Sequence, residues 1–261
     1  MCWDYEVSLG FSILYLVINS CYILMKPPYW REYLMFGMFY FTMEAYQTLQ
    51  WLYGDVYEGD AIAGIENCTA TNTNFTIVGN ILIWLQPILF AYIGYRTTSS
   101  PNVKFAKCLL VVGWIVFFYS LISIHAAFHI NQYYQINESI FGLSTCTNKG
   151  ETGHLVWRYK PVSIDYFPNY LMYLIMCIMA FATYDRSETQ IIDAGWIVSL
   201  VVTKIYLGPS MLEIASSWCL LSIIANCMIF AYLVLPYFDF RKGFRLGHSV
   251  KPRPPAKNNR G

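Results

Sequence analysis

Charge is scarce in this chain: aspartate, glutamate, lysine and arginine make up only 13% of its 261 residues. A soluble domain carries about 25%, so a fully solvated globular surface is not expected. The net charge is +1, which gives no reason to expect a nucleic-acid partner. Apolar residues reach 56% and aromatic residues 18%, with 22 tyrosines. Because tyrosine and tryptophan collect at membrane interfaces, this composition predicts a polytopic membrane protein.

Seven apolar runs approach or exceed the length of a helix that crosses the roughly 30 Å hydrocarbon layer of a bilayer. They cover residues 7–25, 33–53, 77–95, 108–130, 167–184, 191–207 and 211–235. They do not alternate as barrel strands do, so we expect an all-α, seven-helix transmembrane domain over residues 1–240. The first run lacks a basic start and a small-residue cleavage site, so it is interpreted as a helix and not as a signal peptide.

Residues 241–261 are basic and rich in proline. We expect them to form a disordered cytoplasmic tail that lies near anionic lipid of the inner leaflet. If the N-terminus is outside, thirteen basic residues fall in the inner segments and tail and only three in the outer loops. Cytoplasmic segments carry such an excess, so the N-terminus is predicted outside and the C-terminus inside.

Three glycosylation sequons, at Asn67, Asn74 and Asn137, fall on the predicted outer side. Cys68 and Cys146 are the only cysteines in the two long outer loops, and an oxidising compartment favours a disulfide between them. Cys2, also outside, could compete. These features place the chain in the plasma membrane or another membrane of the secretory pathway.

Glu44 lies in the middle of the second apolar run. An ionisable group at that depth costs about 2.5 to 3.5 kcal/mol, and such residues usually face protein or water and mark function. Gln47 and Trp51 share its helix face, and Gln50 borders that face. The functional interpretation is a proton-titrating or cation-binding carboxylate with amides above it. The alternative is a set of hydrogen bonds that hold neighbouring helices together.

Two histidines, His125 and His129, stand one helical turn apart near the predicted outer end of the fourth run. They fit interfacial histidines bonded to neighbours or water, a pH-sensing or ligand-contacting pair, or two ligands of a metal. Zinc would need a third protein ligand, and the sequence contains no H-E-x-x-H pattern.

Lys204 lies within the sixth run, where it could extend to the interface or pair with Glu44 or Glu213. Glu213 fits a capping box with Ser210 at the start of the seventh run, and also the start of a polar face on that helix. Gln86 precedes a proline that we expect to break the third helix near mid-membrane.

Most of these polar residues fall in the predicted outer half of the membrane, which suggests a polar pocket open to the outside. Its candidate ligand- or ion-binding residues are Glu44, Gln47, Gln50, Gln86, His125, His129, Lys204 and Glu213. We expect a protein that binds or transports a small molecule or ion with Glu44 as its titrating centre. The alternatives are a receptor-like signalling protein and a metal-dependent membrane hydrolase using the two histidines. The balance is against an enzyme, and no cofactor is indicated.

The stretches Met43-Glu44-Ala-Tyr-Gln47 and Glu213-x3-Ser217-Trp218-Cys219 resemble uncharacterised seven-helix proteins of large DNA viruses and protists. The resemblance covers the helical region and implies no known activity. The predicted topology also resembles that of G-protein-coupled receptors. Their arginine motif after the third helix is replaced here by Tyr95-Arg96-Thr-Thr, so the similarity is limited to helix number.

Overall fold

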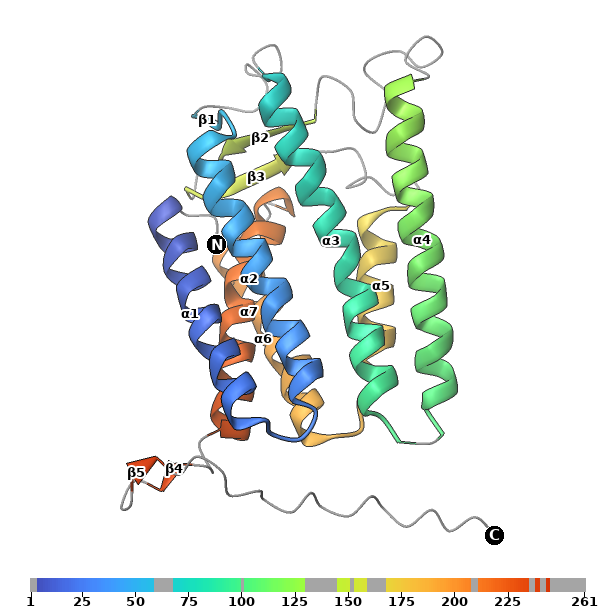
Figure 1. Cartoon of the computed structure of the whole chain (residues 1–261). Coiled ribbons are helices and arrows are strands. Elements are labelled where there is room, and N and C mark those ends of the chain that lie inside the picture. The colour runs from blue at the N-terminus through green and yellow to red at the C-terminus, as the bar shows by residue number, and fades with distance from the viewer. Residues whose placement is uncertain are drawn as a thin grey trace.

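A computed structural model of the chain describes residues 4–58, 68–99, 101–129, 145–150, 153–158, 168–207 and 211–234 and two short strands near the C-terminus. For some of these residues, including 123–129, 206–207 and 211–221, it describes the backbone but not the side chains. Within this part the chain forms a bundle of seven helices (Figure 1). They are α1 (Tyr5–Met25), α2 (Trp30–Tyr53), α3 (Ala70–Thr97), α4 (Val103–His129), α5 (Tyr170–Phe181), α6 (Ser187–Leu207) and α7 (Met211–Val234).

The helices stand at the positions that the apolar runs predict, although most begin a few residues earlier, and the largest differences in extent are at α3 and α5. Helix α3 begins at Ala70, well before the predicted start at residue 77, because Thr69 caps it: the Thr69 hydroxyl oxygen accepts a hydrogen bond from the Asn72 amide at 3.1 Å. Helix α5 has 12 residues, fewer than the predicted 18. At 1.5 Å per residue it is about 18 Å long.

The prediction that Pro87 breaks the third helix was wrong, since α3 continues through it to Thr97. A proline removes one backbone hydrogen bond, but neighbouring helices can hold such a segment in place. Here the residues after Pro87 are buried, and the Phe90 ring packs 4.8 Å from the ring of Phe181 on α5. Helix α3 contacts α2, α4 and α5 and is the central element of the bundle.

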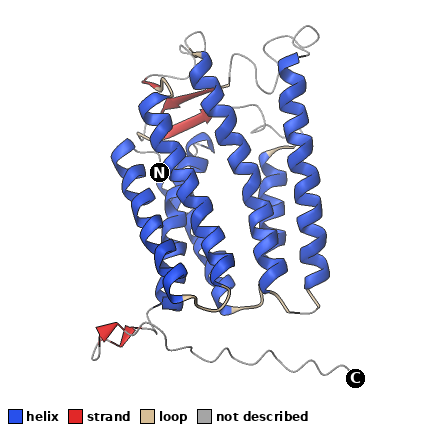
Figure 2. Ribbon diagram, viewed as in Figure 1, coloured by secondary structure: helices blue, strands red, loops and turns tan. Residues whose placement is uncertain are grey.

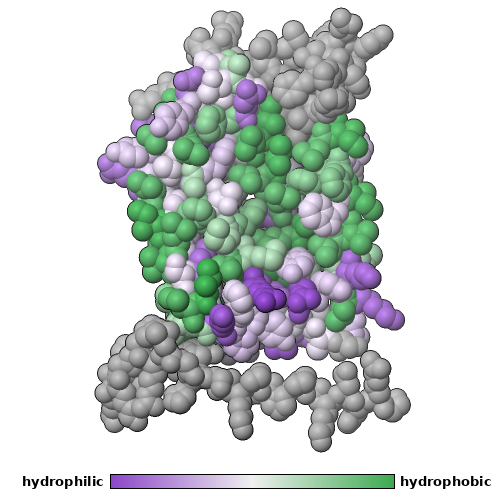
Figure 3. All heavy atoms as spheres, viewed as in Figure 1, coloured by the Kyte–Doolittle hydropathy of each residue, from purple (hydrophilic) through white to green (hydrophobic). Residues whose placement is uncertain are grey.

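Large apolar side chains are exposed along the bundle, among them Ile115, Ile122, Ile178 and Ile205. Figure 3 shows a green band of hydrophobic residues across the helices, with hydrophilic residues at both margins. Three described helical segments are long and apolar enough to cross a membrane: Tyr5–Met25, Ala70–Thr97 and Val103–Ile122. The fold is therefore that of a mainly helical protein suited to a membrane.

A small β-sheet at one end of the bundle corrects the all-α prediction (Figure 2). Strand β2 (Cys146–Lys149) pairs antiparallel with β3 (Leu155–Arg158) and parallel with β1 (Tyr57–Glu58). The turn between β2 and β3 contains Gly153 at φ +84°, a conformation that favours glycine. We call the end of the bundle that carries this hairpin the hairpin end. A second pair, β4 (Phe238–Asp239) and β5 (Gly243–Phe244), follows α7.

The disulfide expected from the sequence is present: Cys68 and Cys146 are bonded, with their Cα atoms 5.9 Å apart. It joins the residue before the α3 cap to the first residue of β2. Residues 241–261, the predicted tail, lie outside the described residues apart from β5.

The opposite end of the bundle, where short turns join the helices, is held by polar contacts. Arg96 Nε lies 3.1 Å from Glu32 Oε1, which joins α3 to α2. Asp185 accepts hydrogen bonds from the amide and hydroxyl of Ser99. Partial burial acts to raise the pKa of Asp185, but these hydrogen bonds outweigh it and hold the pKa below its usual value.

Candidate functional site

Glu44 lies inside the bundle, with 1% of its surface exposed. This confirms the expectation that it faces protein and not lipid. The fully buried Ser8 of α1 forms a hydrogen bond between its hydroxyl and the Glu44 carboxyl. Ser12, one turn further along α1, is also buried. The carboxyl is therefore enclosed at the contact between α1 and α2.

A hydrogen-bond network closes the hairpin end above Glu44. Gln50 of α2 donates to the Thr147 hydroxyl at 2.9 Å and accepts from the indole N–H of Trp157 at 2.9 Å. The Thr76 and Thr147 hydroxyls are 2.7 Å apart. Asn72 forms two further bonds with Thr147, donating to its carbonyl at 2.8 Å and accepting from its amide at 2.7 Å. The hairpin is thus bonded to both α2 and α3.

Two buried amides lie below this network without hydrogen-bond partners among the described residues. Gln47 of α2 is 0% exposed and Asn80 of α3 is 1% exposed, and neither the oxygen nor the nitrogen of either amide is bonded. Buried polar groups are nearly always hydrogen-bonded, and leaving one unsatisfied costs about 1 to 3 kcal/mol. With Asn19 of α1, which is also buried and unbonded at both amide atoms, the described residues include three such amides, an arrangement that needs an explanation.

Contacts between α2 and α3 place these two amides at a similar level of the bundle. Tyr40 pairs with Gln86 at one level, and Gln50 and Thr76 meet at Thr147 at another. In this antiparallel register, residue 47 lies level with residue 79, so Gln47 and Asn80 stand at about the same height, one turn below the hairpin network. Glu44 stands three residues before Gln47 on the same helix face. We refer to Ser8, Glu44, Gln47 and Asn80 as the enclosed cluster.

The other predicted site residues lie elsewhere or outside what is described. Gln86 joins three helices: it donates to the Tyr40 hydroxyl at 2.9 Å and accepts from the Tyr173 hydroxyl. Lys204 is exposed on α6. The side chains of His125, His129 and Glu213 are outside the described residues, although their helices form as predicted.

Of the three sequons, Asn74 is exposed on α3, and Asn67 and Asn137 lie outside the described residues. Among the side chains that are described, no three histidine, cysteine, aspartate or glutamate residues gather in a way that could hold a metal ion.

Sequence reasoning missed Ser8 and Asn80, and it took Gln50 for a ligand contact in an open pocket. A signal for Asn80 existed: it is a polar residue inside the third apolar run, one turn after Thr76. The covering of Gln50 by the hairpin has no comparable signal in the sequence, because it depends on a long-range contact.

The enclosed cluster, the exposed apolar belt and the disulfide-linked hairpin define a mainly helical membrane protein. Its sequence is similar to that of a viral protein: the chain is 55% identical over 233 residues to the uncharacterized protein R287 of Acanthamoeba polyphaga mimivirus. The match covers 89% of this chain and 96% of the viral protein. The chain belongs to the same family as this mimivirus protein, which agrees with the predicted relation to large DNA viruses. No family model and no solved structure matches the chain.

Proposed function

We propose that the protein is a seven-span membrane protein that binds a monovalent cation in the enclosed cluster, with Glu44 as the titrating centre. The observation that supports this is the burial of Glu44 on the same helix face as Gln47, at the level of Asn80 on α3, with both amides unbonded among the described residues. Cation binding would give both amide oxygens a partner and would neutralise the carboxylate.

The charge of the cluster favours a monovalent ion. One carboxylate balances one positive charge, and the remaining oxygens come from neutral amides and the Ser8 hydroxyl. Calcium takes 6 to 8 oxygen ligands, usually with several carboxylates, and magnesium retains several waters. The enclosure also excludes large ligands, so a small inorganic ion fits better than the open small-molecule pocket expected from the sequence.

In the proposed topology the N-terminus and the hairpin end face the outside of the cell or the lumen, and the C-terminus faces the cytoplasm. The thirteen-to-three distribution of basic residues supports this orientation. A disulfide at the hairpin end is consistent with an oxidising compartment, such as the lumen of the secretory pathway. Labelling of an introduced tail cysteine from the exterior of intact cells would contradict it.

Thermal unfolding of the full-length protein in detergent, in sodium, potassium or choline chloride, tests the cation site. A bound ion at 100 times its Kd stabilises the folded state by about 2.7 kcal/mol. We expect one of the alkali ions to raise the midpoint relative to choline in the wild type. The effect should disappear in Glu44→Gln and Asn80→Leu.

Lys204→Gln, on the exposed surface of α6, serves as the control and should keep the response. An equal cation response in wild type and Glu44→Gln, or none in the wild type, would overturn the proposal. In that case the carboxyl only links helices, and Glu44→Leu should cost more stability than Glu44→Gln. No contact among the described residues supports the receptor-like or the hydrolase alternative.

A further inference from the structure

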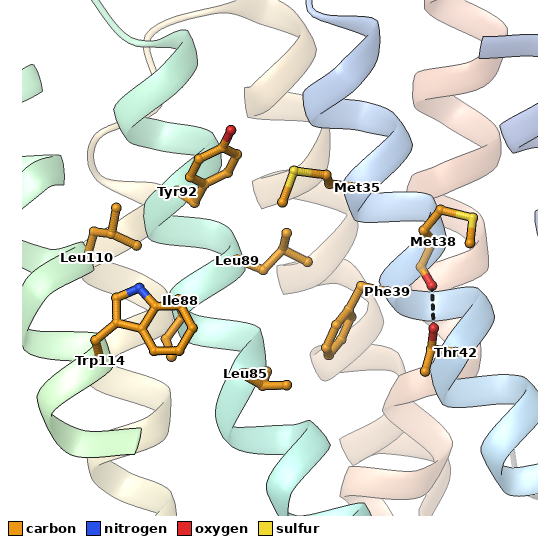
Figure 4. Close-up of a pocket in the computed structure, with 10 residues that line it drawn as sticks. All are labelled: Met35, Met38, Phe39, Thr42, Leu85, Ile88, Leu89, Tyr92, Leu110 and Trp114. Carbon is orange, nitrogen blue, oxygen red and sulfur yellow. Dashed lines mark hydrogen bonds between the residues drawn. The ribbon is translucent and has the colours of Figure 1, made fainter. Parts of the chain in front are cut away.

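A groove with a cavity volume of about 510 Å³ runs between α2, α3 and α4, away from the enclosed cluster (Figure 4). Met35 and Phe39 of α2, Leu85 and Leu89 of α3, and Leu110 and Trp114 of α4 line it. The Thr42 hydroxyl donates to the Met38 carbonyl of its own helix at 2.9 Å, so it offers no donor to an occupant. The volume is in the range of small-ligand pockets, and the lining suits a hydrocarbon chain.

Basic residues stand on the groove-facing side of all three helices, at the short-turn end. Arg31 precedes Met38 by seven residues, Arg96 follows Leu89 by seven, and Lys107 precedes Trp114 by seven. Residues seven apart share a helix face. Each of the three basic residues is exposed, and each lies about one turn beyond the last lining residue of its helix.

Arg96 is oriented by its bond to Glu32, which is 5% exposed and neutralises part of the local charge. The positive charges of Arg31 and Lys107 are not reduced by this glutamate. Lys104, also exposed, stands three residues before Lys107. The groove therefore ends in a positively charged margin, among the hydrophilic residues along the lower edge of the bundle in Figure 3.

We propose that this groove binds an anionic phospholipid, with one acyl chain between α2 and α4 and the phosphate at Arg31, Arg96 and Lys107. Arginine recognises phosphate through parallel N–H···O bonds, and each basic residue near an anionic lipid surface contributes about 1 kcal/mol. A helix of another protein would fill the apolar part but would not need three converging cations at its end. The site is independent of the proposed cation site, because Glu44 faces α1.

Native mass spectrometry of the full-length protein, titrated with phosphatidylglycerol or phosphatidylcholine of identical acyl chains, tests this. We expect the wild type to prefer phosphatidylglycerol. Arg31→Gln with Lys107→Gln should weaken phosphatidylglycerol binding by roughly 10- to 30-fold, since each 1.4 kcal/mol is a factor of ten. Phosphatidylcholine binding should weaken much less, because its choline ammonium balances the charge of its phosphate. Both residues are exposed, so folding should be unaffected.

A second variant separates the groove from general surface charge. Met38→Trp fills the groove and should reduce binding of both lipids, whereas Ile115→Trp, at an exposed α4 position that does not line the groove, should not. The tail is intact in all variants, so its basic residues do not affect the comparison. Equal phosphatidylglycerol binding in the charge variant, or in Met38→Trp, would overturn the proposal. So would a dimer in which a second copy occupies the groove.

Discussion

The side-chain amide of Gln50 on α2 accepts a hydrogen bond from the indole N–H of Trp157 on β3, with 2.9 Å between nitrogen and oxygen. The same amide donates to Thr147 on β2, so a single residue bonds both strands of the hairpin to the bundle. All three residues are buried, and water cannot replace these bonds without opening the structure.

Replacing Gln50 with leucine should therefore lower the free energy of unfolding by about 2 to 5 kcal/mol. The buried Trp157 N–H would lose its Gln50 partner, at about 1 to 3 kcal/mol, and the Thr147 hydroxyl would keep its bond with Thr76 but lose the one from Gln50. Thermal unfolding in detergent measures the loss. The neighbouring Leu49, which is 48% exposed, is the control, and Leu49→Ala should change stability much less. Equal losses in the two variants would show that the hairpin bonds contribute little.

The Cys68–Cys146 disulfide closes a loop with a sequence separation of 78 residues. Chain-entropy reasoning gives a stabilisation of about 4 kcal/mol for a loop of this length. Cys68→Ser, Cys146→Ser and the double variant should be destabilised equally, because each removes the same bond. Peptide mapping without reductant should recover the two segments as one species in the wild type. Free thiols at both positions would contradict the bond.

Gly37 on α2 and Gly10 on α1 form a matched pair for testing the packing of these helices. A Cβ at Gly37 would overlap the buried side chain of Asn19, whereas a Cβ at Gly10 meets nothing within 4 Å. Gly37→Ala should cost about 1 to 3 kcal/mol of stability through overpacking. Gly10→Ala should be neutral or stabilising by up to about 1 kcal/mol. A neutral Gly37→Ala would mean that Asn19 moves aside without cost.

His154, in the hairpin turn, is 1% exposed, and burial lowers its pKa from 6.5 to about 3. Between these values the unfolded chain binds a proton that the folded protein does not, so stability falls as the pH falls from 6.5 towards 3. The slope attributable to this residue is at most about 1.4 kcal/mol per pH unit. Unfolding midpoints between pH 7 and pH 4 should fall less steeply in His154→Gln than in the wild type. Parallel curves would show that His154 titrates normally.

The sequence predicted the presence of the helices well because each corresponds to a long, continuous apolar run, whose helical structure does not depend on its tertiary contacts. Starts and ends depended on local chemistry: the Thr69 cap lengthened α3 beyond its apolar run, and tertiary packing carried α3 through Pro87. The hairpin was missed, although Leu155-Val-Trp157 after Gly153 is a strand signal. A polar outer segment of that length was interpreted as a loop.

The site was predicted in part. Glu44 and Gln47 are identifiable because a carboxylate and an amide are rare in an apolar run. Ser8 and Asn80, the other members of the enclosed cluster, come from helices whose rotation about their own axes the sequence does not specify. Gln86 shows the same limit, since a buried amide in a helix can equally join Tyr40 and Tyr173 or face a ligand.

Thr147 is bonded to α2 through Gln50 and to α3 through Asn72 and Thr76, and its neighbour Cys146 is covalently attached beside the α3 cap. A single residue of β2 is thus hydrogen-bonded to two helices. The bundle cannot separate gradually at this end, because the bonds of Thr147 must break together before α2 and α3 move apart. Solvent reaching Asn80 from the hairpin end would therefore arrive in rare, all-or-none events. The hydrogen-exchange rate of the Thr147 amide would report how often they occur.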